Sequence, residues 1–300
     1  MRFGNRRTSD NVEFREGGSR GGLGLGGGGM GAGAGMLMSF VFSRFGIGGV
    51  IVLFIIMMLL GGNPLGGGSN TAVSPQARTN GQSAAQVCGV DEQRRFLCQV
   101  LASSEEQWSS LFTAAGRTYQ PPRLVFYRGG APTGCGYGDS AMGPFYCPAD
   151  QSIFLDTTFF TELAQRHGAP GDFAQAYVVA HEVGHHVQTI MGTSEQIRRA
   201  QQAVGRDSEA NALQVRMELQ ADCYAGVWAA RERSTLEPGD IEEGMTAAAA
   251  IGDDTLQRAG QGRIVPESFT HGSSAQRQEA LMRGFNGGNP AACDAYTAGI

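Results

Sequence analysis

The sequence predicts an α+β protein, in which one membrane-spanning helix precedes a mostly helical domain with a small sheet. The 300 residues are 41% hydrophobic, enough for one sizeable core. Glycine is concentrated in residues 1–70, which hold 21 of the 46 glycines and look separate from that core. Stretches with helical spacing outnumber short β-rich runs in residues 86–300. We therefore predict a Gly/Arg-rich cytoplasmic tail (1–44), a transmembrane helix (45–62), a flexible linker (63–85) and a folded domain (86–300).

The predicted span, residues 45–62, has no charged residue and no proline. Its 18 residues approach the ~20 that cross a bilayer. Gly-rich flanks and the lack of polar periodicity favour a span over a buried core helix, and the distance from the N-terminus disfavours a cleaved signal peptide. Six arginines precede the run, and the next basic residue is Arg78. The positive-inside rule then predicts a single-pass protein with residues 1–44 in the cytoplasm and residues 86–300 outside it.

Charge and cysteine usage limit the chemistry. The formal net charge of −5 gives no support for nucleic-acid binding. All 23 basic residues are arginine, which excludes a Schiff-base lysine. All six cysteines follow the predicted span, which predicts disulfides in an oxidising compartment. Cys135 and Cys147 are the best pair, and Cys88 and Cys98 are further candidates. The alternative is buried free thiols, which is most favoured for Cys223, and the pairing of Cys88, Cys98, Cys223 and Cys293 stays open.

Apolar spacing locates the elements of the domain in chain order. It predicts strands over 123–127 and 152–155, separated by a Gly/Pro/Cys-rich loop over 129–150. Asp172 and Asp240 are expected to cap the helices that follow them. The predicted helices cover 91–115, 157–167, 172–191, 207–233 and 240–257, and a last helix begins near Ser273.

The run His181-Glu-Val-Gly-His185 lies within the predicted helix 172–191. Residues four apart project from one face of a helix, so both imidazoles can bind one zinc ion, with Glu182 beside them as general base. The alternative is a helix whose histidines only pack or face solvent. Gly184, inside the motif, is expected to let another segment approach the metal closely.

A catalytic zinc site needs a third protein ligand. Glu218 and Asp222 are also four residues apart on a predicted helix. Glu218 can supply the third ligand, and Asp222 can accept the free ring N–H of a ligating histidine. The alternative is a pair of solvated acids, but the apolar residues around them indicate a buried stretch, where acids need partners.

Two late residues can stabilise negative charge on a substrate oxygen. His271 and Arg277 lie just before and within the last predicted helix, and are candidate donors beside a metal. The alternative is a histidine at a helix start and a surface arginine. His186 points away from the two motif histidines and is interpreted as a packing or supporting residue. Asp253-Asp254 is interpreted as a solvated or capping cluster, with a calcium role left open.

With these motifs in place, residues 134–254 resemble the bacterial "putative neutral zinc metallopeptidase" family. The resemblance implies a zincin-like domain of the gluzincin type, with His181, His185 and Glu218 as zinc ligands and Glu182 as base. It rests on three stretches, Ala141–Gln151, Gly168–Gln188 and Leu219–Trp228.

The stretch from Thr270-His271 to Arg277 is similar to the Thr-His-Pro…Arg element of membrane-bound gluzincins such as the CAAX-processing protease, with Gly272 in place of the proline. The resemblance implies an endopeptidase anchored in the bacterial inner membrane. Its substrates would be extracytoplasmic proteins or peptides that add as a strand along residues 153–155. The competing hypothesis is a non-catalytic, zinc-stabilised envelope interaction module. Such a module has no need of Glu182, so the sequence favours an enzyme.

Overall fold

The computed structural model of the protein describes residues 1–16 and 81–300. The predicted span over 45–62 lies outside the described residues, as does most of the predicted linker. Within the two described ranges, no helix has both the length and the apolar character that a membrane crossing requires.

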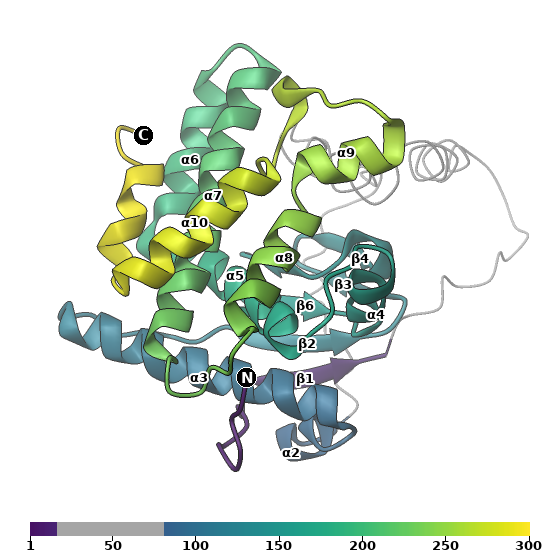
Figure 1. Ribbon diagram of the computed structural model, residues 1–300. Helices are drawn as coiled ribbons and strands as arrows, with labels where there is room; N and C mark the ends of the chain where they lie inside the picture. Colours follow the sequence, from purple (N-terminus) through teal and green to yellow (C-terminus); the bar gives the residue numbers. More distant parts are fainter. Residues whose placement is uncertain (17–80) are drawn as a thin grey trace, which may run out of the picture.

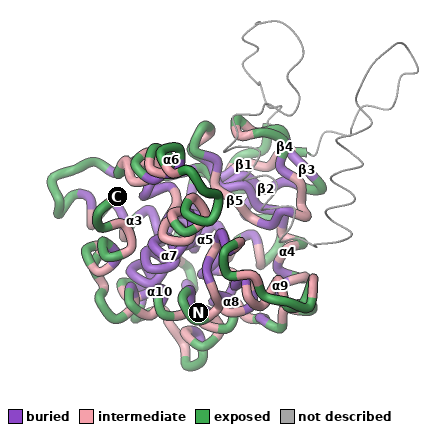
Figure 2. Tube along the Cα trace, turned by 90° about the horizontal axis from the view of Figure 1, so that it is seen from above, coloured by how far each residue is buried: buried purple, intermediate pink, exposed green. Residues whose placement is uncertain are grey.

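The described chain is a mostly helical α+β fold with two small sheets, as the sequence predicts. Helices α6, α7 and α10 gather on one side of the molecule and the strands on the other (Figures 1 and 2). The helices are α2 (Ala84–Cys88), α3 (Glu92–Ala114), α4 (Thr158–Gln165), α5 (Asp172–Met191), α6 (Thr193–Ala203), α7 (Asp207–Arg231), α8 (Asp240–Ala250), α9 (Asp253–Gln261) and α10 (Ser274–Gly287). The strands are β1 (Val12–Arg15), β2 (Arg123–Tyr127), β3 (Gly130–Thr133), β4 (Gly136–Asp139), β5 (Phe145–Cys147) and β6 (Ser152–Leu155).

The larger sheet has the strand order β1-β2-β6-β5. Strands β1, β2 and β6 run parallel, and β5 runs antiparallel to β6. Both β2 and β6 are apolar and almost entirely buried, as strands inside a parallel sheet usually are. The expectation that residues 153–155 form a sheet edge is wrong, because β6 lies between two partners. The free edge on that side belongs to β5.

Three further predictions about the elements are wrong. The predicted loop over 129–150 contains the β3–β4 hairpin, whose glycines hide the alternation that marks a strand, and the three-residue strand β5. The predicted helix over 240–257 is two helices, which separate at Gly252, where a Cβ atom would lie 2.5 Å from the backbone nitrogen of Ser274. Asp172 and Asp240 are the first residues of their helices and not the caps.

Residues 1–16 belong to the folded core, although the sequence predicts a separate tail. Met1, Phe3 and Val12 are buried in the main hydrophobic cluster. Strand β1 pairs with β2 over its full length, with Val12 opposite Leu124. The composition of residues 1–70 predicts a segment outside the core, because the glycine-rich stretch masks the short apolar pattern at the start of the chain.

The N-terminal arginines are partnered within the fold. Arg6 binds Glu232 and Glu106 at 2.6 Å each, and Arg7 binds Glu105 at 3.0 Å. These arginines were the basis for placing the N-terminus in the cytoplasm. Because β1 and β2 are hydrogen-bonded, residues 1–16 lie on the same side of any membrane as the domain. This pairing and the predicted topology, with residues 1–44 inside and 86–300 outside, exclude each other.

The six cysteines form three disulfides: Cys88–Cys98, Cys135–Cys147 and Cys223–Cys293. The predicted Cys135–Cys147 bond is confirmed, and the two further candidates bond to each other. The alternative of a free thiol at Cys223 does not hold, because Cys223 bonds to Cys293. Its partner lies 70 residues away in the 3₁₀ helix Pro290–Tyr296, which packs against α7.

Candidate metal centre

Two helices that pack against each other carry the candidate metal ligands. Helix α5 bears His181, Glu182 and His185, and α7 bears Glu218 and Asp222. The helices approach closely at Gly184, where a Cβ atom would lie 2.9 Å from the carbonyl oxygen of Ala221. The sequence predicted such a close approach, and its effect is to bring the carboxylates of α7 over the histidine face of α5.

Three side chains converge as the sequence predicts. The Nε2 atoms of His181 and His185 are 3.1 Å apart. Glu218 Oε2 lies 3.2 Å from the first of these nitrogens and 3.3 Å from the second. A tetrahedral zinc ion with ligand bonds of about 2.05 Å requires ligand atoms about 3.3 Å apart, so the donor set fits zinc in both chemistry and spacing.

Asp222 lies on the far side of His181 from Glu218. Its Oδ1 is 2.7 Å from His181 Nδ1, and it also accepts hydrogen bonds from the Tyr177 hydroxyl at 2.5 Å and Arg277 Nη2 at 3.0 Å. The arrangement fixes the tautomer that leaves Nε2 free to face Glu218 and His185. It is the position that the sequence predicted for Asp222.

Glutamines support the other two ligands, and the sequence analysis missed them. Gln188 Oε1 is 2.9 Å from His185 Nδ1, and the Gln188 amide donates to the Met217 carbonyl at 2.7 Å. The Gln214 amide donates to Glu218 Oε1 at 2.8 Å. Each stands three or four residues from its ligand on the same helix, so helical spacing was the signal that could have found them.

The electrostatics of the cluster favour positive charge. Burial opposes a charged imidazole, but the charge and hydrogen bond of Asp222 outweigh it and raise the pKa of His181 to about 10. Burial likewise opposes ionisation of Glu218, yet the two histidines hold its pKa well below the usual range. The carboxylates therefore stabilise a cation between them, and a metal ion would displace the imidazole protons.

Glu182 lies next to the ligands and does not join them. It is 7% exposed, and burial raises its pKa, although the neighbouring histidines and a hydrogen bond from the Tyr146 backbone N–H act in the opposite direction. Tyr146 belongs to β5, so the outer edge of this strand faces the carboxylate. The Tyr146 hydroxyl is 3.0 Å from His186 Nδ1, and His186 Nε2 is 2.6 Å from the Gln120 carbonyl oxygen. His186 is thus a packing residue, as predicted.

His271 reaches the site from the loop before α10. Asp253 Oδ2 accepts the backbone N–H groups of Thr270, His271 and Gly272 at 2.6–3.0 Å, so Asp253 organises this loop and is not a solvated acid. Burial lowers the pKa of His271, but its hydrogen bond to Asp253 and the charge of Glu218 raise it overall. Gly272 has φ +93°, a conformation closed to proline, so the loop differs from the Thr-His-Pro turn of the similar proteases.

Arg277 is buried, with 2% of its surface exposed. Its Nε and Nη2 donate to the two oxygens of Asp222 at 2.9 and 3.0 Å, and Nη1 donates to the Ile251 carbonyl at 3.1 Å. All three nitrogens are engaged inside the protein. Arg277 is therefore neither a surface residue nor placed to donate to a substrate; it holds Asp222.

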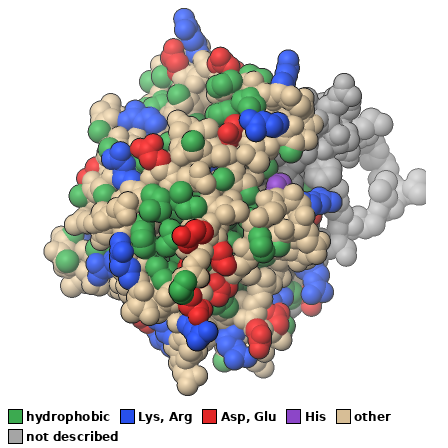
Figure 3. Space-filling model, in the orientation of Figure 1, with side chains coloured by type: hydrophobic (Ala, Val, Ile, Leu, Met, Phe, Trp, Pro, Cys, Tyr) green, Lys and Arg blue, Asp and Glu red, His purple; other side chains and the backbone are tan. Residues whose placement is uncertain are grey.

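A second group of acids, Asp172, Asp240 and Glu243, also comes together. The amino group of Met1 lies among them, 2.8 Å from Asp172 and 3.0 Å from Asp240. The positive charge that these acids contact is therefore the amino group of Met1. On the face shown in Figure 3, histidine reaches the surface at one small spot.

A His-Glu-x-x-His helix joined by a glutamate from a second helix defines the site of a zincin-type metallopeptidase. The chain belongs to the family described as "Putative neutral zinc metallopeptidase", whose sequence pattern matches residues 1–296. The match includes the N-terminal segment that packs into the core.

Relatives cover most or all of the chain. "Uncharacterized protein YpfJ" of Escherichia coli (strain K12) is 45% identical over 308 aligned residues, which include all of both chains. "Uncharacterized protein Rv2575" of Mycobacterium tuberculosis (strain ATCC 25618 / H37Rv) is 43% identical over 226 residues, 70% of this chain and 74% of the relative. No solved structure matches.

Proposed function

We propose that the protein is a zinc-dependent endopeptidase. The observation that carries the proposal is the convergence of His181, His185 and Glu218, whose ligand atoms all lie within 4.8 Å, with the buried Glu182 carboxylate beside them. Family membership supports peptidase chemistry in general terms. A module stabilised by zinc alone would need the three ligands but not a fourth, non-ligating acid next to them.

Each residue of the site has a separate role in hydrolysis. Zinc, when bound, would polarise the scissile carbonyl and make water a better nucleophile. Glu182 accepts the proton of the attacking water and delivers it to the leaving amine, and its raised pKa suits both tasks. Asp222, held by Arg277, keeps His181 in the ligating tautomer. His271, a half-buried residue whose charge interacts with that of Glu218, stabilises the negative charge on the substrate oxygen.

The free edge of β5 is the proposed substrate platform. Tyr146 pairs with Ile153 of β6, and its backbone N–H points at Glu182. An extended peptide that adds along this edge would pass directly over the general base. The substrate is accordingly an extended segment of a protein or peptide.

We also propose that residues 45–62 attach the enzyme to a membrane without carrying the chain across it, and that the enzyme works in an oxidising, extracytoplasmic compartment. The support is the hydropathy of that run and the three disulfides. Residues 1–16 lie in the same compartment, because β1 pairs with β2.

The test uses the full chain, because residues 1–16 are part of the core. Wild type is assayed for zinc content and for casein cleavage with and without a chelator. Glu182→Gln should fold and retain zinc but lose cleavage by at least about 10²–10⁴-fold. His271→Ala should retain zinc and lose about 10²–10³-fold. Glu218→Ala should lose most of the metal.

The outcomes separate the two hypotheses. Full zinc occupancy in Glu218→Ala would refute the ligand assignment. A Glu182→Gln variant that retains zinc and complements a deletion strain as well as wild type would show that the protein acts as a non-catalytic interaction module and not as an enzyme.

A further inference from the structure

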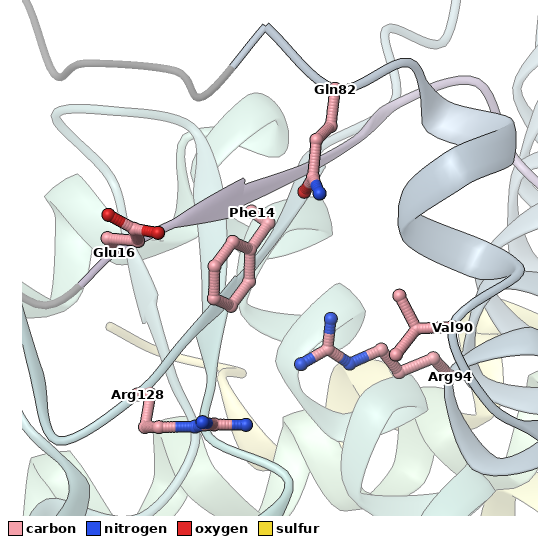
Figure 4. A pocket seen from close by; sticks show the side chains of 6 residues that line it. All are labelled: Phe14, Glu16, Gln82, Val90, Arg94 and Arg128. Atoms are coloured by element: carbon pink, nitrogen blue, oxygen red, sulfur yellow. The ribbon is translucent and has the colours of Figure 1, made fainter.

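A second pocket lies between β1 and the start of α3, and none of its residues belongs to the metal centre. Its volume is about 450 Å³. Figure 4 shows its side chains around a central space, with the guanidinium of Arg94 and the amide of Gln82 directed into it. The lining residues are Phe14, Glu16, Gln82, Val90, Arg94 and Arg128.

Arg94 is a buried cation whose hydrogen-bond donors are not used by the described protein. It is 8% exposed and its guanidinium stacks on Phe14 and Phe126, 5.0 and 5.4 Å from the ring centroids. Its Nε is buried without a hydrogen-bond partner in the described residues. The nearest carboxylate oxygen, on Asp91, is 3.9 Å from Nε, too far for a hydrogen bond.

A buried guanidinium in contact with two aromatic rings presents its N–H groups in a planar fork. This geometry matches the oxygens of a carboxylate or a phosphate. Arg128 supplies a second guanidinium to the lining of the pocket (Figure 4). The two arginines therefore make this pocket selective for an oxyanion.

The other residues that line the pocket limit which kinds of ligand it can bind. Glu16 places one carboxylate at the rim, so a simple anion would meet repulsion there. A ligand with an ammonium group near its anion would be stabilised by all three charges. Phe14 and Val90 provide apolar surface, and Val90 is 55% exposed at the mouth. Two cations, one carboxylate and an apolar rim are complementary to a zwitterion.

The connecting chain cannot supply the anion itself. Residues 17–80, which join the two rims at Glu16 and Gln82, contain no Asp or Glu, and their charged residues are Arg20, Arg44 and Arg78. A partner for the unused donors of Arg94 is therefore sought in a separate molecule.

We propose that this pocket binds a phosphoethanolamine group, with Arg94 and Arg128 contacting the phosphate and Glu16 contacting the ammonium. The group can belong to a phospholipid head group or to a free phosphoethanolamine. The chemistry is the same for both sources, and the experiment distinguishes them.

The experiment uses the full chain in detergent and measures binding calorimetrically with two soluble probes, phosphoethanolamine and inorganic phosphate. Wild type should bind phosphoethanolamine more tightly than inorganic phosphate. Arg94→Gln should weaken binding of both by about 10–100-fold, the loss expected for hydrogen bonds between charged groups. Arg95→Gln, an exposed neighbour outside the pocket, is the matched control and should bind as wild type does.

Two further variants keep the test independent of folding. The exposed Arg128→Gln should also weaken binding of both probes. Glu16→Gln should remove the preference for phosphoethanolamine but keep phosphate binding. In mixed micelles, tighter binding to phosphatidylethanolamine than to phosphatidylcholine would assign the lipid as the source, and binding of soluble phosphoethanolamine alone would assign the free compound.

Absence of binding to either soluble probe would overturn the proposal, as would Arg94→Gln binding with wild-type affinity. Equal affinity for the two probes, unchanged in Glu16→Gln, would overturn the assignment of phosphoethanolamine. Zinc content, which the pocket does not touch, checks that each variant is folded.

Discussion

The two ligand-bearing helices approach each other closely at Gly184, and its replacement by alanine tests how the metal centre depends on packing. The added Cβ would lie 2.9, 3.0 and 3.2 Å from the carbonyl oxygen, Cα and Cβ of Ala221. Contact with backbone atoms cannot be relieved by rotating a side chain. Helix α7 must therefore move away from α5 by a few tenths of an ångström, and Glu218 and Asp222 move with it.

The expected change in stability is a difference of two terms. Overpacking of a well-packed interior costs about 1–3 kcal/mol. Replacing a mid-helix glycine by alanine returns about 1 kcal/mol of helix propensity. The net loss of unfolding free energy is then about 0–2 kcal/mol. Because the shift separates the carboxylates from the histidines, zinc affinity should fall by about tenfold or more, as when supporting contacts of metal ligands are removed.

Urea unfolding with a chelator measures how the substitution changes the stability of the metal-free protein, and unfolding without chelator adds the contribution of bound metal. Competition with a chromogenic chelator measures zinc affinity. Gly205→Ala is the control, because its Cβ meets no atom within 4 Å and should stabilise by about 0.4–1 kcal/mol. A Gly184→Ala protein stabilised like the control, with unchanged zinc affinity, would show that the helix contact does not set the geometry of the site.

Three further predictions follow from other parts of the structure. Cys293→Ser opens a 70-residue disulfide loop and should reduce the unfolding free energy by about 4 kcal/mol in the chain-entropy estimate, measured in urea; an unchanged midpoint would show that the bond adds nothing. Asp156 has a pKa below its usual value because, although burial raises it, hydrogen bonds from Ser140 and the backbone outweigh that effect. Its stabilisation is present above the unfolded pKa and is lost as pH falls through the folded pKa, so Asp156→Asn should be less stable at pH 7 and should flatten the acid side of a pH-stability curve. Arg15→Cys with Tyr127→Cys, opposite each other in β1 and β2, should form an interstrand disulfide in cells; two thiols that remain alkylatable would restore the topology with residues 1–44 across the membrane.

The metal motif was predictable from the sequence because its information is local. His181, Glu182 and His185 are fixed relative to one another by the helix alone, and so are Glu218 and Asp222. Helix periodicity also located α3, α5 and α7, whose lengths give strong patterns. The adjacent cysteines 135 and 147 could be paired because only a short loop separates them.

What required the tertiary structure was every contact between segments far apart in the chain. Nothing local shows that Arg277 holds Asp222, or that Cys223 meets Cys293. The edge position of β5 depends on strand order, which short parallel strands do not encode individually.

The N-terminal segment shows the same limit most clearly. By composition and arginine content it matched a cytoplasmic tail. Its arginines instead pair with acids in α3 and directly after α7, about 100 residues or more away, and its strand completes the sheet. A charge has the same sequence signature whether water, a membrane surface or a distant carboxylate balances it, and only the folded structure decides which of them does.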